Sequence, residues 1–308
     1  MSLRYLSYQK IDKTKWDQCI RKSVNGLIYA ESVYLDHMAA HWDGIVLNNY
    51  EAVMPLTWKK KLGIKYLYQP SFFQQGGIFS AEEISQELVA AFLDLAAEKF
   101  RFAEITLNYK NLLVQKNKLV KTTLRNNFVL NLEDSYADLS GNFSTYIKQR
   151  LKKAYAFPLV YKKSTDYKSA IRLYKKLYQE RLPSFTNKDY RNFEKLCVNL
   201  AENKRVLIRQ VYHAETNELL AMVLLLRDKK RLYNMASSLL PAGKKLLANY
   251  YLYNEIIREF AETALVLDFE GSDVPGIAYF YGKFTSTNEQ YPFIRYNRLP
   301  APIRFLKD

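Results

Sequence analysis

The 308-residue sequence is poor in the residues that build disulfides and metal sites, with two cysteines and three histidines. Cys19 and Cys197 stand far apart without metal-like spacing, so we expect two free thiols, as in a reducing compartment. His37 and His41 stand one helical turn apart, but no carboxylate lies between them and no third ligand accompanies them. The sequence therefore predicts no metal site.

Long apolar runs are also absent. The longest are strand-like segments such as 221–226, which are far shorter than a membrane-spanning helix. The first ten residues, MSLRYLSYQK, contain no apolar stretch typical of a secretory signal. We therefore expect a cytoplasmic protein without a membrane span.

Acidic residues are outnumbered, with 31 Asp and Glu against 46 Lys and Arg, and the formal net charge is +15. The basic residues form short runs spread along the chain, at 59–61, 148–153, 162–163, 172–176, 229–231 and 244–245. This dispersion indicates basic surface on folded elements, which either attracts an anionic partner or is simply a solvated face. The sequence is 48% hydrophobic and 15% aromatic, enough to bury the cores of two domains.

Two stretches repeat the same predicted order of elements. The first has strands at 44–47, 51–58 and 64–69, a helix that begins near Ser80, and a strand at 102–107. The second has strands at 205–212, 218–227 and 231–236, a helix at 245–262, and a strand at 265–268. Three antiparallel strands, a helix and a further strand is the order of a GNAT core.

The stretch 264–284 joins two carboxylates, a turn and an aromatic cluster. A buried strand ends at Asp268, Glu270-Gly271-Ser272 breaks it, and aromatic residues then surround Lys283. From spacing alone, the stretch 264–284 is either an ordinary capped connection between a strand and a helix or a loop that carries catalytic or binding residues at the edge of the scaffold. DFEGS followed by GIAYFYGKF resembles the C-terminal signature of the Fem-type transferases, which add amino acids to peptidoglycan precursors, and of their GNAT-fold acyltransferase relatives.

A second stretch carries the same resemblance. The apolar residues 128–132 and the basic helix 143–155, FSTYIKQRLKKAY, resemble the segment that opens the second lobe in the Fem-type family. The repeat and the resemblance agree on an α/β (α+β) fold: two tandem GNAT-like domains with mixed, mostly antiparallel sheets flanked by helices. We place the boundary near 111–126, with the first domain at 1–118 and the second at 119–308.

The resemblance supplies candidate site residues. Asp268 and Glu270 could accept a proton from an attacking ammonium and Lys283 could stabilise charge, or the carboxylates could cap the turn and pair with Lys283. In the family pattern a lysine often follows the phenylalanine directly, where this chain has Tyr281. The candidate substrate-binding residues are Tyr279, Phe280, Tyr281, Ser272, Arg150 and Lys153, with Tyr68 and Gln75 lining either a cleft between the lobes or a packed loop.

The cofactor signal is incomplete. GNAT enzymes usually carry a glycine-rich Q/R-x-x-G-x-G/A loop whose amides hold a pyrophosphate at a helix N-terminus. The corresponding segment 238–245 has one glycine, and the equivalent loop 69–77 lacks the motif as well. Gly243, Lys244 and Lys245 form either a phosphate site or a solvated turn. The predicted acyl donor is therefore acyl-CoA or, as the resemblance implies, aminoacyl-tRNA, with no metal.

These observations predict a transferase that moves an acyl or aminoacyl group onto an amine, such as that of a cell-wall precursor. Its expected partners are an anionic or nucleotide-linked substrate and, through the resemblance, tRNA. The alternative is a non-catalytic module that binds nucleic acid or another anionic partner on the same fold, which the two incomplete loops favour.

Overall fold

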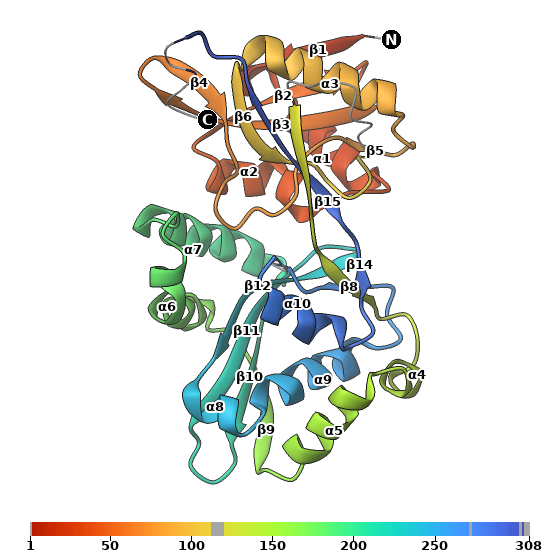
Figure 1. Ribbon diagram of the computed structural model, residues 1–308, viewed down its shortest axis with the longest axis vertical. Coiled ribbons are helices and arrows are strands. Elements are labelled where there is room, and N and C mark those ends of the chain that lie inside the picture. The colour runs from red at the N-terminus through yellow and green to blue at the C-terminus, as the bar shows by residue number, and fades with distance from the viewer. Residues whose placement is uncertain (1, 112–119, 271–272, 302–303, 305–308) are drawn as a thin grey trace. The chain divides into compact units, whose positions relative to one another are not determined.

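The computed structural model describes residues 2–111, 120–270, 273–301 and 304. Backbone contacts divide the chain into two units (Figure 1): the first consists of residues 1–125 and 290–308, and the second of residues 126–289. Each has its own sheet and its own hydrophobic core.

The first unit is built on an eight-stranded sheet, in the order β1-β2-β3-β4-β6-β15-β7 with β5 paired to β3. The strands are β1 (Leu3–Leu6), β2 (His41–Leu47), β3 (Ala52–Lys61), β4 (Ile64–Leu67), β5 (Phe79–Ser80), β6 (Phe102–Thr106), β7 (Val120–Arg125) and β15 (Tyr291–Asn297). The helices are η1 (Tyr8–Lys10), α1 (Lys13–Lys22), η2 (Ile28–Ala30), α2 (Ser32–Met38) and α3 (Gln86–Lys99).

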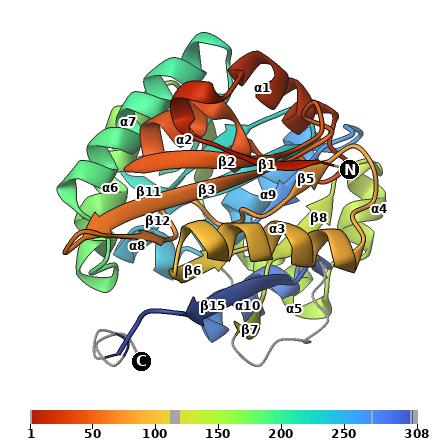
Figure 2. The same ribbon diagram turned by 90° about the horizontal axis from the view of Figure 1, so that it is seen from above.

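Helices cover both faces of this sheet (Figure 2). On one face α3 buries Val89, Phe92 and Ala96 against strand residues such as Ile105. On the other, α1 inserts the fully buried Trp16, whose Nε1 donates to the carbonyl of Ala30 at 2.8 Å. Removing these apolar surfaces from water holds both layers together.

Two boundaries in the first unit differ from the sequence-based expectation. Helix α3 begins at Gln86 rather than near Ser80, because the side chain of Ser85 caps it by accepting from the Leu88 amide at 3.2 Å. The C-terminal strand β15 inserts between β6 and β7, with Ile294 opposite both Ile105 and Thr122. Strands β7 and β15 therefore belong to the first unit, whereas the predicted boundary assigned 119–308 to the second domain.

The second unit has a seven-stranded sheet in the order β14-β8-β13-β12-β11-β10-β9. The strands are β8 (Phe128–Asn131), β9 (Leu159–Ser164), β10 (Val206–His213), β11 (Leu219–Arg227), β12 (Arg231–Leu239), β13 (Val266–Asp268) and β14 (Thr287–Asn288). The helices are α4 (Tyr136–Gly141), α5 (Thr145–Ala154), α6 (Tyr167–Tyr178), η3 (Gln179–Arg181), α7 (Asn187–Glu202), α8 (Pro241–Lys245), α9 (Ala248–Phe260) and α10 (Pro275–Gly282).

The core of the second unit lies between its sheet and two helices. Ile147 and Leu151 of α5 pack with Leu252 and Ile256 of α9 against β11 and β13, while α6 and α7 cover the opposite face (Figure 1). The amphipathic pattern of the basic helix explains this placement, because its apolar residues recur at helical spacing and its lysines face outward.

The predicted repeat is present. In each unit three antiparallel strands, a long helix and a further strand follow one another: β2-β3-β4-α3-β6 and β10-β11-β12-α9-β13. The last strand pairs in parallel with the third, at Leu67 and Ala103 in the first unit and over Arg231–Tyr233 and Val266–Asp268 in the second. The predicted α/β fold with two helix-flanked sheets is confirmed.

Among the described helices, none is both long and apolar enough to span a membrane. Within the same residues no group of three or more His, Cys, Asp or Glu side chains could hold a metal ion. Both cysteines are buried, and burial raises the pKa of each thiol.

Candidate active site

In the second unit, the neighbouring parallel strands β12 and β13 separate after a short stretch of pairing. Pairing between β12 and β13 ends at Tyr233 and Asp268, whereas residues 234–239 of β12 continue with β11 alone. β12 also carries a bulge here, because Leu224 lies opposite Ala236 and Leu225 opposite Asn234.

A network of buried hydroxyls and one amide lies at this opening. The Nδ2 atom of Asn234 donates to the hydroxyls of Tyr253 at 2.7 Å and Tyr281 at 2.8 Å, and to the carbonyl of Phe269 at 3.1 Å. The two hydroxyls lie 3.2 Å apart. Asn234 is 6% exposed, and its Oδ1 atom has no hydrogen-bond partner among the described residues. A buried acceptor without a donor is rare in native proteins, and a water molecule or a ligand group can supply the missing donor.

Burial raises the pKa of the phenols of Tyr253 and Tyr281. Both hydroxyls therefore remain protonated near neutral pH, so they can act as hydrogen-bond donors or general acids. Tyr281 was among the candidates predicted from the sequence, whereas Asn234 and Tyr253 were not. The available signal was a lone Asn inside the otherwise apolar segment RLYNMA, where a buried amide needs a purpose.

Asp268 is fully buried at the end of β13 and is held by structural contacts. Its Oδ2 atom lies 2.9 Å from Nη1 of Arg231 and accepts from Nδ2 of Asn127 at 3.2 Å. Its Oδ1 atom accepts from the backbone amide of Glu270 at 3.1 Å. This carboxyl fixes the turn after β13 and ties β12, β13 and β8 together, which is the capping alternative left open by the sequence.

Glu270 follows with a positive φ of 57°, and burial raises the pKa of its carboxyl well above the ordinary value. A carboxylate with raised proton affinity is suited to accept a proton. Ser272, the other candidate in this turn, lies outside the described residues.

Helix α10 carries the remaining candidates of the signature. Phe280 and Tyr281 pack into an aromatic cluster with Tyr253, with ring centroids 5.7 and 5.6 Å from the Tyr253 ring. Tyr279 points outward and is 55% exposed. Lys283, at the C-terminal end of the helix, places its ammonium 4.5 Å from the centre of the Tyr279 ring.

Helix α5 adds a second cation beside α10. The guanidinium of Arg150 lies 5.0 Å from the centre of the Tyr146 ring, and that ring lies 5.9 Å from the ring of Tyr279. The hydroxyl of Tyr146 lies 3.1 Å from that of Tyr250. The pKa of Tyr146 is lowered by this hydrogen bond, followed by the positive charges of Arg150 and Lys283. In the described part of the chain neither cation forms an ion pair with a carboxylate.

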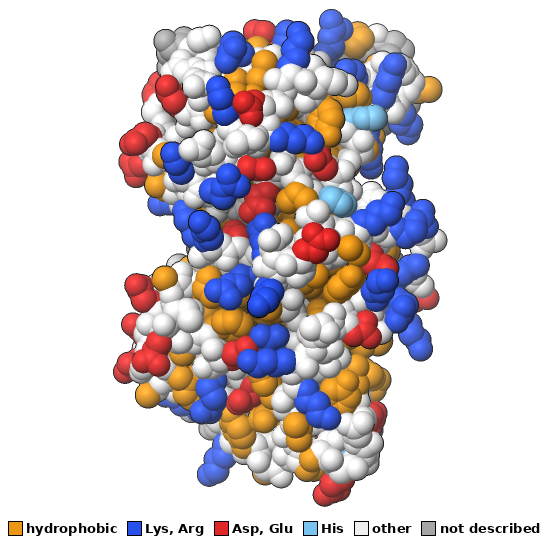
Figure 3. Space-filling view, turned by 180° about the vertical axis from the view of Figure 1, so that it is seen from behind, with side chains coloured by type: hydrophobic (Ala, Val, Ile, Leu, Met, Phe, Trp, Pro, Cys, Tyr) orange, Lys and Arg blue, Asp and Glu red, His pale blue; other side chains and the backbone are white. Residues whose placement is uncertain are grey.

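We refer to Tyr146, Arg150, Tyr250, Tyr279 and Lys283 as the cationic rim. Aromatic contacts lead from it to the buried hydroxyls, because the Tyr250 ring lies 5.0 Å from that of Phe280, which contacts Tyr253. Lys153, the other candidate on α5, is exposed and makes no contact with the rim that the structure shows. Over the face drawn in Figure 3, lysines and arginines are scattered among other side chains.

The predicted phosphate-binding residues follow β12. Gly243 lies in the five-residue helix α8, where a Cβ atom would stand 2.0 Å from the carbonyl oxygen of Leu220. Close packing of α8 on β11 therefore requires this glycine. Lys244 and Lys245 are exposed in the last turn of α8, just before Leu247 turns the chain into α9 with a φ of 57°.

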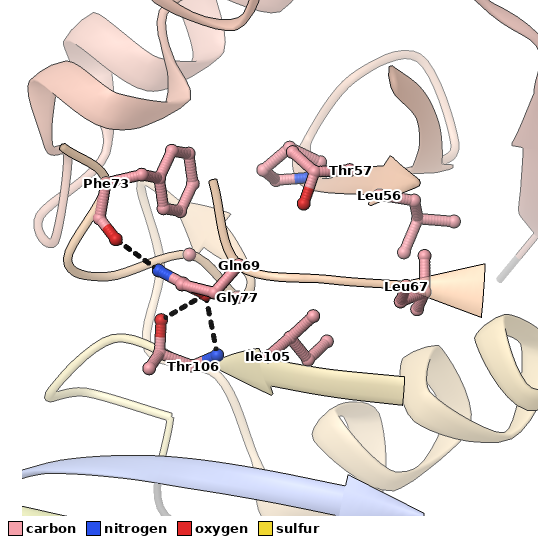
Figure 4. Close-up of a pocket in the computed structure, with 10 residues that line it drawn as sticks. Leu56, Thr57, Leu67, Gln69, Phe73, Gly77, Ile105 and Thr106 are labelled. Carbon is pink, nitrogen blue, oxygen red and sulfur yellow. Dashed lines mark hydrogen bonds between the residues drawn. The ribbon is translucent and has the colours of Figure 1, made fainter. Parts of the chain in front are cut away.

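In the first unit, the corresponding opening between β4 and β6 is filled by residues of the protein itself. Beyond Leu67 the side-chain amide of Gln69 lies between β4 and β6 (Figure 4). Its Oε1 accepts from the amide of Thr106 at 3.1 Å and from the hydroxyl of Thr106 at 2.9 Å. Its Nε2 donates to the carbonyls of Phe73 and Gln74. The space that remains is about 10 Å³, no more than one water requires.

Two further candidates belong to this unit and have local partners. Tyr68 accepts a hydrogen bond from the amide of Ala40 at 2.8 Å, and the ammonium of Lys59 lies 4.1 Å from its ring centre. Gln75 is completely buried and accepts from the amide of Tyr109 at 3.0 Å. Both contacts agree with the packed-loop interpretation.

Comparison with known proteins finds a family model that matches part of the chain. Residues 141–279 match the family model described as an acetyltransferase (GNAT) domain. A segment of 139 residues, all within the second unit, is thus similar to GNAT acetyltransferase domains. No curated protein matches the sequence significantly.

Solved structures extend the GNAT fold to the whole chain. FemX is 14% identical, with complete coverage of both chains and a TM-score of 0.67. L-PGS from Bacillus licheniformis is 10% identical over 96% of this chain and 95% of its own, with a TM-score of 0.52. A tandem GNAT protein from the clavulanic acid biosynthesis pathway is 11% identical over 97% of this chain and 100% of its own, with a TM-score of 0.50. The predicted pair of GNAT-like domains is thus confirmed.

Proposed function

We propose that the second unit of this GNAT protein transfers an acyl or aminoacyl group to an amine at the opening between β12 and β13. One observation carries the proposal: the opening holds two protonated tyrosine hydroxyls and an unbonded Asn234 oxygen. In the first unit, by contrast, the amide of Gln69 satisfies all its own hydrogen bonds. Polar groups that remain available in a buried site are those that a substrate can use.

The chemistry follows from these groups. An amine nitrogen attacks the activated acyl carbon, a C–N bond forms, and the carbonyl oxygen becomes an oxyanion. The hydroxyl of Tyr281 donates a hydrogen bond to this oxygen, supported by Asn234 and Tyr253. Collapse of the tetrahedral species breaks the bond to the leaving group, which takes up a proton. Glu270 accepts the proton that the attacking ammonium gives up, since burial raises its proton affinity.

The cationic rim is proposed to hold the anionic part of a substrate. Arg150 and Lys283 pair with no carboxylate among the described residues, and the exposed ring of Tyr279 lies beside them. Such cations suit a phosphate or carboxylate attached to a larger organic group. Electrostatic attraction from the net charge of +15 would raise the rate of encounter with such a ligand. Lys283 is thus assigned to binding, while the acid–base role falls to Glu270 and Tyr281.

For the donor we favour aminoacyl-tRNA over acyl-CoA. A pyrophosphate-binding loop usually contains several glycines, whereas the segment 238–245 has only Gly243, and close packing against Leu220 already accounts for that glycine. The resemblance to Fem-type transferases and the fold shared with FemX support an aminoacyl donor and an amine of a cell-wall precursor as acceptor.

The proposal is tested by presenting the purified chain with alanyl-, seryl- and lysyl-tRNA or with acetyl-CoA, each with UDP-linked muropeptide as the amine. Mass spectrometry should detect an amide product that depends on the enzyme and on one aminoacyl-tRNA. Binding of tRNA without product from any donor would instead support a non-catalytic binding module.

A further inference from the structure

A cavity in the first unit lies apart from the opening that Gln69 closes. Its volume is about 520 Å³, within the range of small-molecule sites. It is formed by the start of the chain, the end of α2 and the edges of β2, β3 and β4. Its aromatic lining consists of Tyr5, Tyr8, Trp42 and Trp58 together with His41, whose ring stacks on that of Trp58 with the centroids 4.3 Å apart.

One half of this cavity is acidic. Asp43 is 4% exposed and accepts from the hydroxyl of Tyr5 at 2.5 Å and from the amide of Tyr8 at 2.9 Å. Among the described residues no lysine or arginine lies within ion-pair distance of it. The second carboxylate, Asp36, is paired with Lys13 at 2.7 Å. Asp43 is therefore a buried carboxylate without a cation, and a ligand ammonium would supply the missing charge.

Two other lining residues, Lys65 and Trp58, supply a positive charge and a hydrogen-bond donor. The ammonium of Lys65 lies 4.2 Å from the centre of the Trp58 ring and forms no ion pair with a described carboxylate. The Nε1 atom of Trp58 is buried and has no acceptor in the described chain. The other indole of the cavity differs, because Nε1 of Trp42 donates to Asp36 at 3.0 Å. A ligand carboxylate would satisfy both Lys65 and Trp58.

The aromatic walls suit an ammonium as well. Lysine ammonium groups of the chain lie near three of these rings, namely Lys65 over Trp58, Lys13 4.5 Å from the Tyr8 ring centre and Lys99 5.7 Å from that of Tyr5. Ring faces attract cations and also bury apolar side chains.

We propose that this cavity binds a small zwitterion, a free α-amino acid with an apolar or aromatic side chain. Its ammonium lies against Asp43, its carboxylate against Lys65 and Trp58, and its side chain against the aromatic walls. The ligand needs both an ammonium and a carboxylate, because in the described part of the chain neither the carboxylate of Asp43 nor the ammonium of Lys65 forms an ion pair. This site lies in the first unit and does not depend on the proposed transfer reaction.

Isothermal titration of the full chain with three related probes tests the proposal. L-phenylalanine carries both charges, phenethylamine lacks the carboxylate, and N-acetyl-L-phenylalanine lacks the ammonium. We expect L-phenylalanine to bind and each analogue to bind at least about 10-fold more weakly. The absence of binding by L-phenylalanine at millimolar concentration, or equal binding of all three probes, overturns the proposal.

Variants assign each half of the site. Asp43→Asn should weaken L-phenylalanine and phenethylamine about 10-fold and leave the N-acetyl analogue unchanged. Lys65→Gln and Trp58→Phe should weaken L-phenylalanine and the N-acetyl analogue and leave phenethylamine unchanged. Lys60→Gln, an exposed lysine of β3, is the matched control and should bind all three as the natural chain does. If Asp43→Asn fails to fold, Lys65→Gln and Trp58→Phe still test the proposal. It is contradicted if both variants bind the three probes with the same affinities as the natural chain.

Discussion

The side-chain amide nitrogen of Asn234 lies 2.8 Å from the hydroxyl of Tyr281, joining the third strand of the second core to the helix that follows its last strand. In the Fem-type pattern a lysine often takes the place of this tyrosine. Here a hydroxyl that burial keeps protonated occupies that place and is oriented by Asn234 and Tyr253. The substitution changes a point charge into a directed hydrogen-bond donor.

Replacing Gln69 by Leu should destabilise the first unit without lowering turnover. The change removes the side-chain amide and leaves the backbone amide of Thr106 and the carbonyl of Phe73 without their partners, which should cost about 2 to 3 kcal/mol. The carbonyl of Gln74 keeps its hydrogen bond from the hydroxyl of Thr106. Urea unfolding measures this loss. Gln86→Leu at the exposed start of α3 is the control and should change stability by less than about 0.5 kcal/mol. If a folded Gln69→Leu variant lost turnover, the transfer site would depend on the first unit, which would contradict its assignment to the second unit.

Acid should weaken the second unit through Glu259. Burial tends to raise the pKa of this carboxyl, but hydrogen bonds from Arg209, Lys163 and Tyr161 outweigh it and lower the pKa to about 2. A lowered folded pKa contributes stability that is complete above the unfolded value near 4.5 and is lost as the pH falls toward 2. The shift alone corresponds to about 3 kcal/mol, which partial solvent screening reduces to about 2.

The matching variant is Glu259→Gln. It should be less stable than the natural chain at pH 7, and the difference in unfolding free energy should shrink between pH 4.5 and pH 2. A difference that stays constant over this range would mean that Glu259 acts by packing and not by its charge.

The cationic rim makes a prediction about salt. Arg150→Gln with Lys283→Gln should weaken binding of the anionic substrate and reduce the slope of its affinity against salt concentration, because two charge contacts are lost. The control is Lys152→Gln with Lys153→Gln, two exposed residues of the same helix that carry the same charge. If the two double variants weaken binding equally, the cationic rim does not contact the substrate and only the net charge of the protein contributes to binding.

Local patterns were sufficient to predict the order of elements. The apolar spacing of 187–202 predicts a helix, and α7 occupies those residues because Thr186 and Asp189 form a capping box. The C-terminal strand was not predictable in this way, since its partners lie about 190 and 170 residues earlier, at Ile105 and Thr122.

The site shows the same limit. The signature at 264–284 locates Tyr281 and Glu270 by resemblance, but it cannot show that Arg231 neutralises Asp268 from another strand. The role of Gln69 depends on contacts with Thr106, which strand pairing brings near it. The burial of a residue and the identity of its hydrogen-bond partners depend on packing between segments far apart in the sequence, so local periodicity cannot predict them.

The most direct test of the account is the turnover of Tyr281→Phe, measured with the donor and amine that give product. Loss of one donor to a developing oxyanion should lower the rate by about 10² to 10³, while loss of the buried hydrogen bonds lowers stability by about 1 to 2 kcal/mol. Tyr161→Phe loses a comparable hydrogen bond, to Glu259, away from the opening, and should retain full turnover despite a similar drop in melting temperature. A Tyr281→Phe enzyme that turns over at the natural rate would contradict the assignment of the transfer site to this opening.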